Sequence, residues 1–392
     1  MTFLTRPALF DRCRITLFFV ICFSLTQISL LAQEKKPAKP AWQYDAGGIK
    51  VPAASADEPK IAFGPESIKA ALKYLDDGAL SWTRGRKCIA CHSTGVYLAE
   101  RTQLTKLFGP PQKEVYDIFA TTVPDSVAEP QIRDGKKMYA DVIFAVWRTL
   151  GLAQWDKFVT GKLSAETEKS IKDLLMRQSD DGLWTTATKV EIPYIRTDYE
   201  LGLQSLRAMV AAPGWLEKNS DTELKKRVEK LKLALKNTKP ANDFERVQRL
   251  QLYAIMPELV SKEEMTTANT ILTKLQKPDG GWSTRSFSKT PEWGPNITPE
   301  NIKMIDSEAD AADPASDPFM TAFAVVSLRE SGMPADDPRI VKAIAWLKSN
   351  QRQTGRWWMK SLYKNTQHYI TYISTAQVLR ALALCNELPV NP

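Results

Sequence analysis

A short run of cysteines and histidine is the first group of residues with a recognisable chemistry. Cys88, Cys91 and His92 form the pattern C-x-x-C-H directly after Lys87. Two thiols at this spacing reach the two vinyl groups on one edge of a porphyrin, and the adjacent imidazole then lies beneath the iron as the proximal ligand. The pattern therefore predicts one covalently attached c-type haem (haem c).

The same residues support two other interpretations. Cys88 and Cys91 could form a disulfide, either redox-active or structural. Alternatively, the two cysteines and a histidine could bind zinc. Haem is attached to such motifs outside the cytosol, so the choice between these readings depends on whether the chain is exported.

The N-terminus has the features of an export signal. Arg6, Arg12 and Arg14 precede an apolar run over 15–32, and a Lys/Pro-rich stretch follows it. This order is typical of a secretory signal peptide, here 1–32, cleaved after Ala32. We therefore expect a periplasmic or secreted protein. An uncleaved membrane anchor is the alternative, because a run of about 18 apolar residues can just span a bilayer.

Composition narrows the class of protein further. Of the five cysteines only three lie beyond the signal, too few for a disulfide framework, so the core must be held by packing. The net charge of +8 comes from acids and bases interspersed along the chain. A nucleic-acid partner is not expected, because it would require a clustered basic stripe.

Most of the chain has helical periodicity. Residues 33–63 are rich in Pro and Lys and are predicted to be a flexible leader. From 64 to 388, apolar residues recur at helical spacing, with an acidic, Pro-rich insertion at 283–318.

Three segments of this region share one turn. Each runs from Gln to Trp through a Gly, over 178–184, 276–282 and 351–357, between an amphipathic helix and a more apolar one. The first two turns are separated by about twice the length of one hairpin unit, which is roughly 50 residues. We therefore expect one degenerate hairpin, without this turn, between them. With two earlier units, six helical hairpins result. Such units stabilise one another by stacking or ring closure.

The Q-x-x-D-G-x-W turns followed by T-A-F-A-type helices resemble the QW repeats of squalene and hopene cyclases, of the terpenoid-cyclase and protein-prenyltransferase class. The resemblance implies an all-α fold, an α/α toroid of about six hairpins forming one domain over 64–388. It also implies that each Gln amide caps a neighbouring helix end and that each Trp stacks on the next turn.

The catalytic residues of this family are only partly present in the sequence. Its cyclases carry D-x-D-D-T-A, whose middle Asp protonates the alkene, whereas this chain has Asp317-Pro-Phe-Met-Thr-Ala with Phe319 in the donor's place. The zinc ligands of the prenyltransferases are absent as well. Ordinary polyprene cyclisation is therefore not expected, and whether the protein is an enzyme stays open.

Ring closure suggests a second haem ligand. A six-hairpin ring places the first hairpin beside the last, so His92 and His368 would begin neighbouring inner helices at one rim. His368, the only other histidine, is therefore the predicted second axial ligand. Met320 and Met359 are the thioether alternatives, although methionines of this kind also fill cores.

Aromatic residues at the starts of inner helices could line an apolar cavity for an isoprenoid- or quinone-like ligand, with core packing as the alternative. These residues are Tyr194, Tyr199, Phe319, Phe323, Tyr369 and Tyr372.

The combined expectation is an exported toroid that carries haem c and exchanges electrons with a redox partner protein. The alternative is a cyclase-like enzyme, or a lipid-binding or scaffold module, with Cys88 and Cys91 in a disulfide or zinc site.

Overall fold

Helices account for most of the protein, as the periodicity predicts. The computed structural model describes residues 42–127, 129–133, 135–186, 197–293, 297–362 and 369–388. All elements belong to one compact unit, Lys39–Pro392, and the other unit, Met1–Ala38, lies outside the described residues. The predicted signal peptide, 1–32, therefore also lies outside them. No helix in the described ranges has both the length and the apolar character needed to cross a bilayer.

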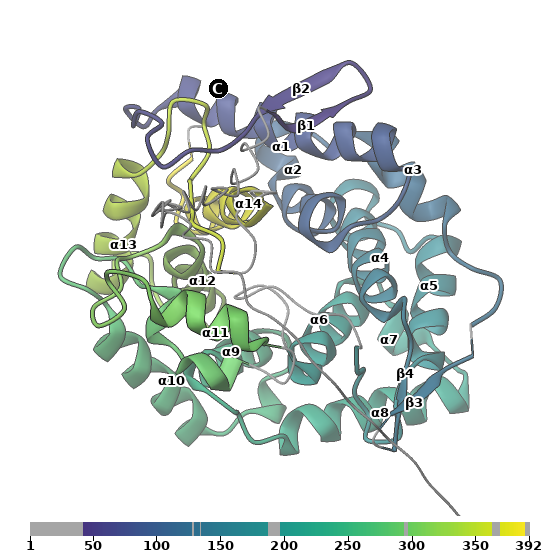
Figure 1. The fold of residues 1–392 in the computed structure, drawn as a ribbon. Helices are drawn as coiled ribbons and strands as arrows, with labels where there is room; N and C mark the ends of the chain where they lie inside the picture. The colour runs from purple at the N-terminus through teal and green to yellow at the C-terminus, as the bar shows by residue number, and fades with distance from the viewer. Residues whose placement is uncertain are drawn as a thin grey trace, which may run out of the picture. The chain divides into compact units, whose positions relative to one another are not determined.

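Six helices open the hairpins and form an outer ring (Figure 1). They are α1 (Pro65–Arg86), α3 (Lys113–Thr121), α5 (Ala165–Met176), α8 (Thr222–Asn237), α10 (Lys262–Leu275) and α13 (Pro338–Ser349). α8 buries only four of its sixteen residues, at helical spacing, because one face contacts the inner ring and the other faces solvent.

Six further helical segments form the inner ring. The first, here called the first inner helix, is built from η1 (Cys91–Gly95), η2 (Tyr97–Arg101), η3 (Thr102–Leu104) and α2 (Thr105–Phe108). The other five are α4 (Val142–Trp155), α6 (Asp198–Ala211), α9 (Asp243–Ile255), α12 (Pro318–Glu330) and α14 (Tyr369–Leu384). α12 buries eleven of its thirteen residues, because an inner helix is covered on every side.

The inner ring is closed. Each inner helix packs against the next one in the chain, and α14 packs against both α12 and the first inner helix. The predicted α/α toroid and its six hairpins, including the degenerate fourth formed by α8 and α9, are confirmed by this closed double ring.

The glutamine of each repeated turn links neighbouring hairpins. Its side-chain amide donates to the Gly carbonyl of its own turn and to a carbonyl of the next outer helix. The acceptors, at 2.8–3.0 Å, are Gly182 and Arg227 for Gln178, Gly280 and Arg339 for Gln276, and Gly355 and Ser67 for Gln351. The predicted contact to a neighbouring helix is confirmed.

The tryptophan of each turn makes a hydrogen bond that the resemblance did not imply. Its indole N–H donates to a carbonyl near the end of the preceding outer helix, from Trp184 to Leu174 at 2.9 Å and from Trp282 to Leu272 at 2.8 Å. Trp357 makes the equivalent bond to Leu347. Each of these carbonyls also accepts a backbone N–H, so the indole adds a second donor and links the turn to the end of its own outer helix.

Glycine is required in these turns for two reasons. Gly182 and Gly280 have φ of +92°, and Gly355 has φ of +85°, a conformation that L-residues rarely adopt. A Cβ atom would also lie 2.7 Å or less from a backbone atom of the next outer helix in all three turns. The absence of a side chain lets consecutive outer helices approach closely.

The segment before α1 is structured, contrary to part of the prediction. Strands β1 (Trp42–Ala46) and β2 (Ile49–Pro52) form an antiparallel hairpin that packs on α1. Farther along, the Glu58 carboxylate accepts from the backbone N–H of Thr354 at 2.7 Å. The flexible leader predicted for 33–63 is therefore wrong from Trp42 onward, because long-range contacts hold this Pro/Lys-rich sequence.

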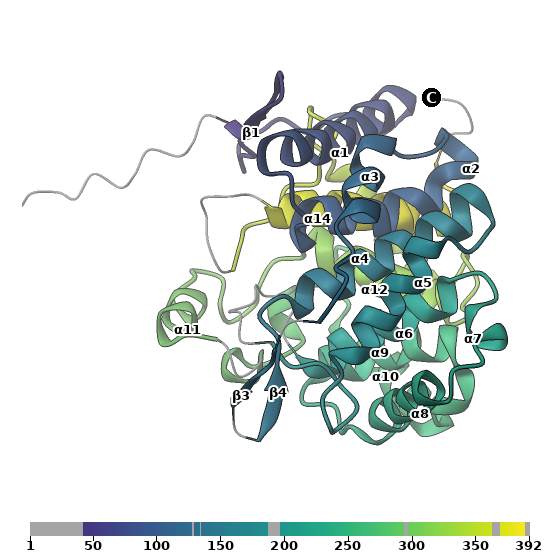
Figure 2. The same cartoon turned by 90° about the vertical axis from the view of Figure 1, so that its right-hand side faces the viewer.

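The predicted insertion at 283–318 contains short helical turns rather than a simple loop. It holds η6 (Thr284–Ser286), η7 (Thr290–Trp293) and α11 (Pro299–Asp306). α11 projects from the same side of the ring as the hairpin of β3 (Gln131–Arg133) and β4 (Lys136–Met138) (Figure 2).

Replacing Gln351 with Ala should weaken ring closure. The change removes both amide donations and leaves two carbonyls without these donors, so we expect the free energy of unfolding to fall by about 1–3 kcal/mol. Urea denaturation measures the loss. Gln353→Ala, two residues away and exposed, is the matched control and should change stability by less than about 0.5 kcal/mol. Equal losses in the two variants would contradict the closing role of Gln351.

Candidate functional site

The C-x-x-C-H motif joins the outer and inner helices of the first hairpin. α1 ends at Arg86, and Lys87 adopts a left-handed conformation with its N–H donating to the Thr83 carbonyl at 2.9 Å. Cys88 is exposed on the loop, and Cys91 is half-buried as the first residue of the first inner helix. The two cysteines thus lie on either side of the helix start at one rim.

The first inner helix begins with π-helical turns, η1 and η2. The Gly95 N–H donates to the Ala90 carbonyl at 2.8 Å, and the Thr94 hydroxyl accepts from the Ala90 N–H at 3.0 Å. Wide turns of this kind are uncommon and are often found at functional sites. These bonds fix the direction in which His92 leaves the backbone.

Two aromatic rings hold the His92 imidazole. Tyr369, the first residue of α14, stacks on it with ring centroids 4.6 Å apart and planes 27° apart. Trp82 of α1 contacts it edge-on at 4.9 Å and 88°. We call these two side chains the aromatic clamp. It combines residues of the first and last hairpins, as the predicted ring closure requires.

The His92 imidazole is neutral at neutral pH. Burial lowers its pKa from an ordinary 6.5 to about 4. Its Nδ1 atom is buried and has no hydrogen-bond partner among the described residues. A neutral imidazole is the form that ligates a metal.

The cysteines are thiols. Neither Cys88 nor Cys91 is in a disulfide. Cys385 is a buried core residue, and burial raises the pKa of its thiol to about 11. No three His, Cys, Asp or Glu side chains in the described ranges converge closely enough to hold a metal ion.

The other predicted haem ligands are placed as follows. His368 lies outside the described residues, as does Tyr194; Tyr369, the next residue after His368, contacts His92. Met320 and Met359 are buried core residues, and the Met359 sulfur accepts from the Ser374 hydroxyl at 3.6 Å.

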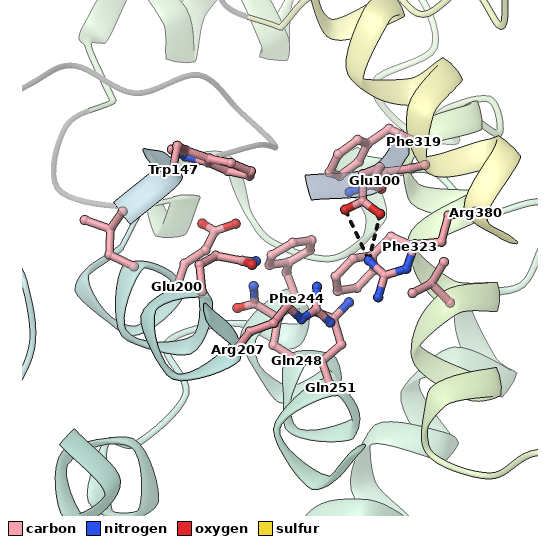
Figure 3. Close-up of a pocket in the computed structure, with 14 residues that line it drawn as sticks. Glu100, Trp147, Glu200, Arg207, Phe244, Gln248, Gln251, Phe319, Phe323 and Arg380 are labelled. Carbon is pink, nitrogen blue, oxygen red and sulfur yellow. Dashed lines mark hydrogen bonds and ion pairs between the residues drawn. The ribbon is translucent and has the colours of Figure 1, made fainter. Parts of the chain in front are cut away.

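A group of buried charged side chains lies where the inner helices meet around a central pocket (Figure 3). Here Glu100 pairs with Arg380 at 3.0 Å, Arg380 pairs with Glu330, and Glu330 pairs with Arg207 at 3.0 Å. We call these four residues the charge chain. Burial would raise the pKa of Glu330, but Arg380 and Arg207 together hold it below its usual range.

The central pocket does not fit the predicted apolar ligand. Phe319 and Phe323 do line it, and Phe323 stacks on Phe244 at 4.4 Å. However, eight of the fourteen described lining residues are polar, and the volume is about 30 Å³. Such a space holds a water or two. Of the other predicted lining residues, Tyr199 and Tyr372 are buried core residues.

The charge chain was not predicted, although a signal exists in the sequence. Arg380 is the only charged residue of α14, and Arg207 lies in the mostly apolar second half of α6; charged residues at such positions require buried partners. The acidic partners lie far away in the sequence. The sequence therefore indicates that Arg207 and Arg380 need partners, but not which residues these are.

Asp317, the one acid retained from the cyclase pattern, caps a helix. One carboxylate oxygen accepts from the Met320 N–H at 2.8 Å and the other from the Thr284 N–H at 2.5 Å. Burial raises its pKa to about 6. Both oxygens accept backbone N–H groups, so Asp317 serves as the N-cap of α12.

Comparisons with known proteins add likenesses of fold. No family model matches the chain, and no curated protein matches it. A protein from Actinoplanes is 13% identical, with a TM-score of 0.44, over 82% of this chain and 99% of the other. An unsaturated glucuronyl hydrolase specific for heparin is 11% identical, with a TM-score of 0.49, over 83% and 99%. The type II terpene cyclase MstE from Scytonema, in its apo form, is 13% identical, with a TM-score of 0.45, over 82% and 98%. The toroid assignment rests on the closed double ring itself.

Glu330→Gln should destabilise the protein strongly. The change removes the only carboxylate paired with Arg207 in the charge chain, and an uncompensated buried charge costs about 3–5 kcal/mol. Thermal or urea unfolding measures the loss. Glu229→Gln is the control, because Glu229 pairs with Lys232 at the surface and should contribute less than about 1 kcal/mol. A loss in Glu330→Gln no larger than in this control would contradict the buried charge chain.

In haem-free protein, His92 should make stability depend on pH. The unfolded state binds a proton on acidification from pH 6.5 to 4 and the folded state does not, so stability falls over this range. His92→Phe keeps an aromatic ring but cannot titrate. The stability advantage of the parent over this variant should therefore shrink by about 1–3 kcal/mol between pH 7 and 4. Parallel unfolding curves for the two proteins across this range would exclude the effect.

Proposed function

We propose that this protein attaches one c-type haem at Cys88, Cys91 and His92 and takes part in electron transfer or redox chemistry with a partner protein outside the cytosol. The observation that carries the proposal is the His92 imidazole, which is neutral, has an unpartnered buried Nδ1 atom and is fixed by the aromatic clamp. The N-terminal sequence supports export, which haem attachment requires.

The arrangement of the motif suits a haem better than its alternatives. A zinc site needs its ligands to converge on one point, and a disulfide needs the two sulfurs to be bonded. A porphyrin is contacted instead at separate places, two along one edge and one at the centre. Cys88 and Cys91 do not form a disulfide, and in the described ranges they belong to no group of three metal-binding side chains, which is compatible with the third geometry.

Each residue has a distinct task in this proposal. Cys88 and Cys91 would form the two thioether bonds, and His92 would be the proximal ligand through Nε2, with Tyr369 and Trp82 holding its ring plane. The haem, when bound, would supply a one-electron iron couple. Because Nδ1 has no acceptor among the described residues, the ring contacts to Tyr369 and Trp82 would orient the ligand.

Production of the full chain in a periplasm that attaches haem tests the proposal. We expect one haem per chain that survives denaturation, seen by intact mass and by a pyridine haemochrome spectrum. Cys88→Ala and Cys91→Ala should each lose one thioether bond and sharply lower the haem content. His92→Ala should lower haem incorporation.

Cys385→Ala is the matched control, because this buried cysteine lies at the end of α14 and should leave haem content unchanged. A colourless parent protein of unmodified mass, or one that contains one zinc per chain, would overturn the proposal.

A further inference from the structure

A second, larger cavity lies at the rim, between the turns of the fifth and sixth hairpins. Its volume is about 300 Å³, at the lower end of the range for small-molecule sites. The insertion at 283–318 forms one wall, and α13 with the segment after the sixth turn forms the other. The charged and aromatic lining residues are Arg285, Glu308, Asp310, Asp317, Trp346, Arg352, Trp358 and Lys360.

Most charges in this cavity are already compensated. Lys360 pairs with Glu308, and Arg285 pairs with Asp310 at 2.5 Å. The Asp317 carboxylate accepts two backbone N–H groups as the cap of α12. These groups balance one another without a ligand.

Arg352 is the exception. Its Nη1 donates to the Glu58 backbone carbonyl at 2.8 Å, and its Nε is buried without an acceptor among the described residues. The nearby Glu58 carboxylate is already used by Thr354 and, at 3.3 Å, by Arg356. Of the cations that line the cavity, Arg352 alone has no carboxylate partner in the described ranges.

The position of Arg352 is fixed before any ligand arrives. Its backbone N–H donates to the Arg356 carbonyl at 2.9 Å within the sixth turn, and a β-bridge joins it to Lys60. These contacts fix its backbone, and the Nη1 donation to the Glu58 carbonyl restrains its guanidinium, whose planar donors match a carboxylate.

Apolar surface is available in the same cavity. Trp358 is half-buried, and its indole makes no hydrogen bond in the described ranges. Trp346, also half-buried, donates to the Asp279 carboxylate at 3.0 Å. Indole rings of this kind provide flat surfaces for the C–H groups of a ring-shaped ligand.

We infer that this rim cavity binds an acidic sugar, with its carboxylate on Arg352 and its ring against Trp358. The paired carboxylates of Asp310 and Glu308 retain free lone pairs that can accept sugar hydroxyls, because each oxygen accepts more than one hydrogen bond. A neutral sugar would leave Arg352 unpaired, and a simple anion would leave the indoles uncovered. This site is separate from the motif at Cys88–His92, and its occupation does not depend on haem.

Isothermal titration with two matched disaccharides tests the inference. The probes are α-1,4-digalacturonate and α-1,4-galactobiose, which differ only in their carboxylates. We expect the acidic probe to bind at least tenfold more tightly, and this preference to weaken at high salt. Arg352→Gln should abolish the preference, bringing the acidic probe to the level of the neutral one. Arg246→Gln, at a surface arginine outside this cavity, should leave both affinities unchanged.

Trp358→Leu is a second test, because this change leaves Arg352 and its contact to Glu58 intact. It should weaken both disaccharides by a similar factor while keeping their ratio. Equal binding of the two probes, absence of binding to the folded parent protein, or an undiminished preference in Arg352→Gln would each overturn the inference. Thermal melting of every variant establishes that it is folded before titration.

Discussion

The bond on which this structure depends is the donation of a turn glutamine to the next outer helix. A single helical hairpin cannot cover both faces of its inner helix, so each unit is stable only against its neighbours. Gln351 makes this contact to the Ser67 carbonyl across 284 residues and so joins the last turn to the first outer helix. Gly355 allows the approach, since any side chain there would collide with the backbone of α1.

Ring closure also creates the candidate haem site. His92 belongs to the first hairpin and Tyr369 to the last, so their stacking exists only in the closed ring. The imidazole is consequently oriented by tertiary structure, whereas the two cysteines are placed by the local turn after α1. Stability of the closure and order at the site are therefore coupled. Opening the ring at the Gln351 contact would remove one half of the aromatic clamp.

Local patterns were enough to predict the toroid, because helical periodicity and the Gln–Gly–Trp turns repeat along the chain. The motif at Cys88–His92 could be predicted equally well, because its residues lie close together in sequence. The features that escaped prediction depend on residues far apart in sequence. Glu58 holds a Pro-rich segment to the sixth turn, and Arg380 meets Glu100 across 280 residues. No periodicity marks such pairs, and a Lys/Pro-rich composition alone suggested flexibility where contacts impose order.

The centre of this toroid is polar and holds four buried charged side chains. Carbocation chemistry needs an apolar chamber and an acid with a proton to give. Here the centre is crossed by Glu100, Arg380, Glu330 and Arg207, and each carboxylate is committed to a guanidinium. A carboxylate held ionised by two arginines cannot serve as a proton donor. The proposed haem-binding residues Cys88 and His92 lie instead where the first outer helix meets the first inner helix, with His92 stacked on Tyr369 of the last hairpin.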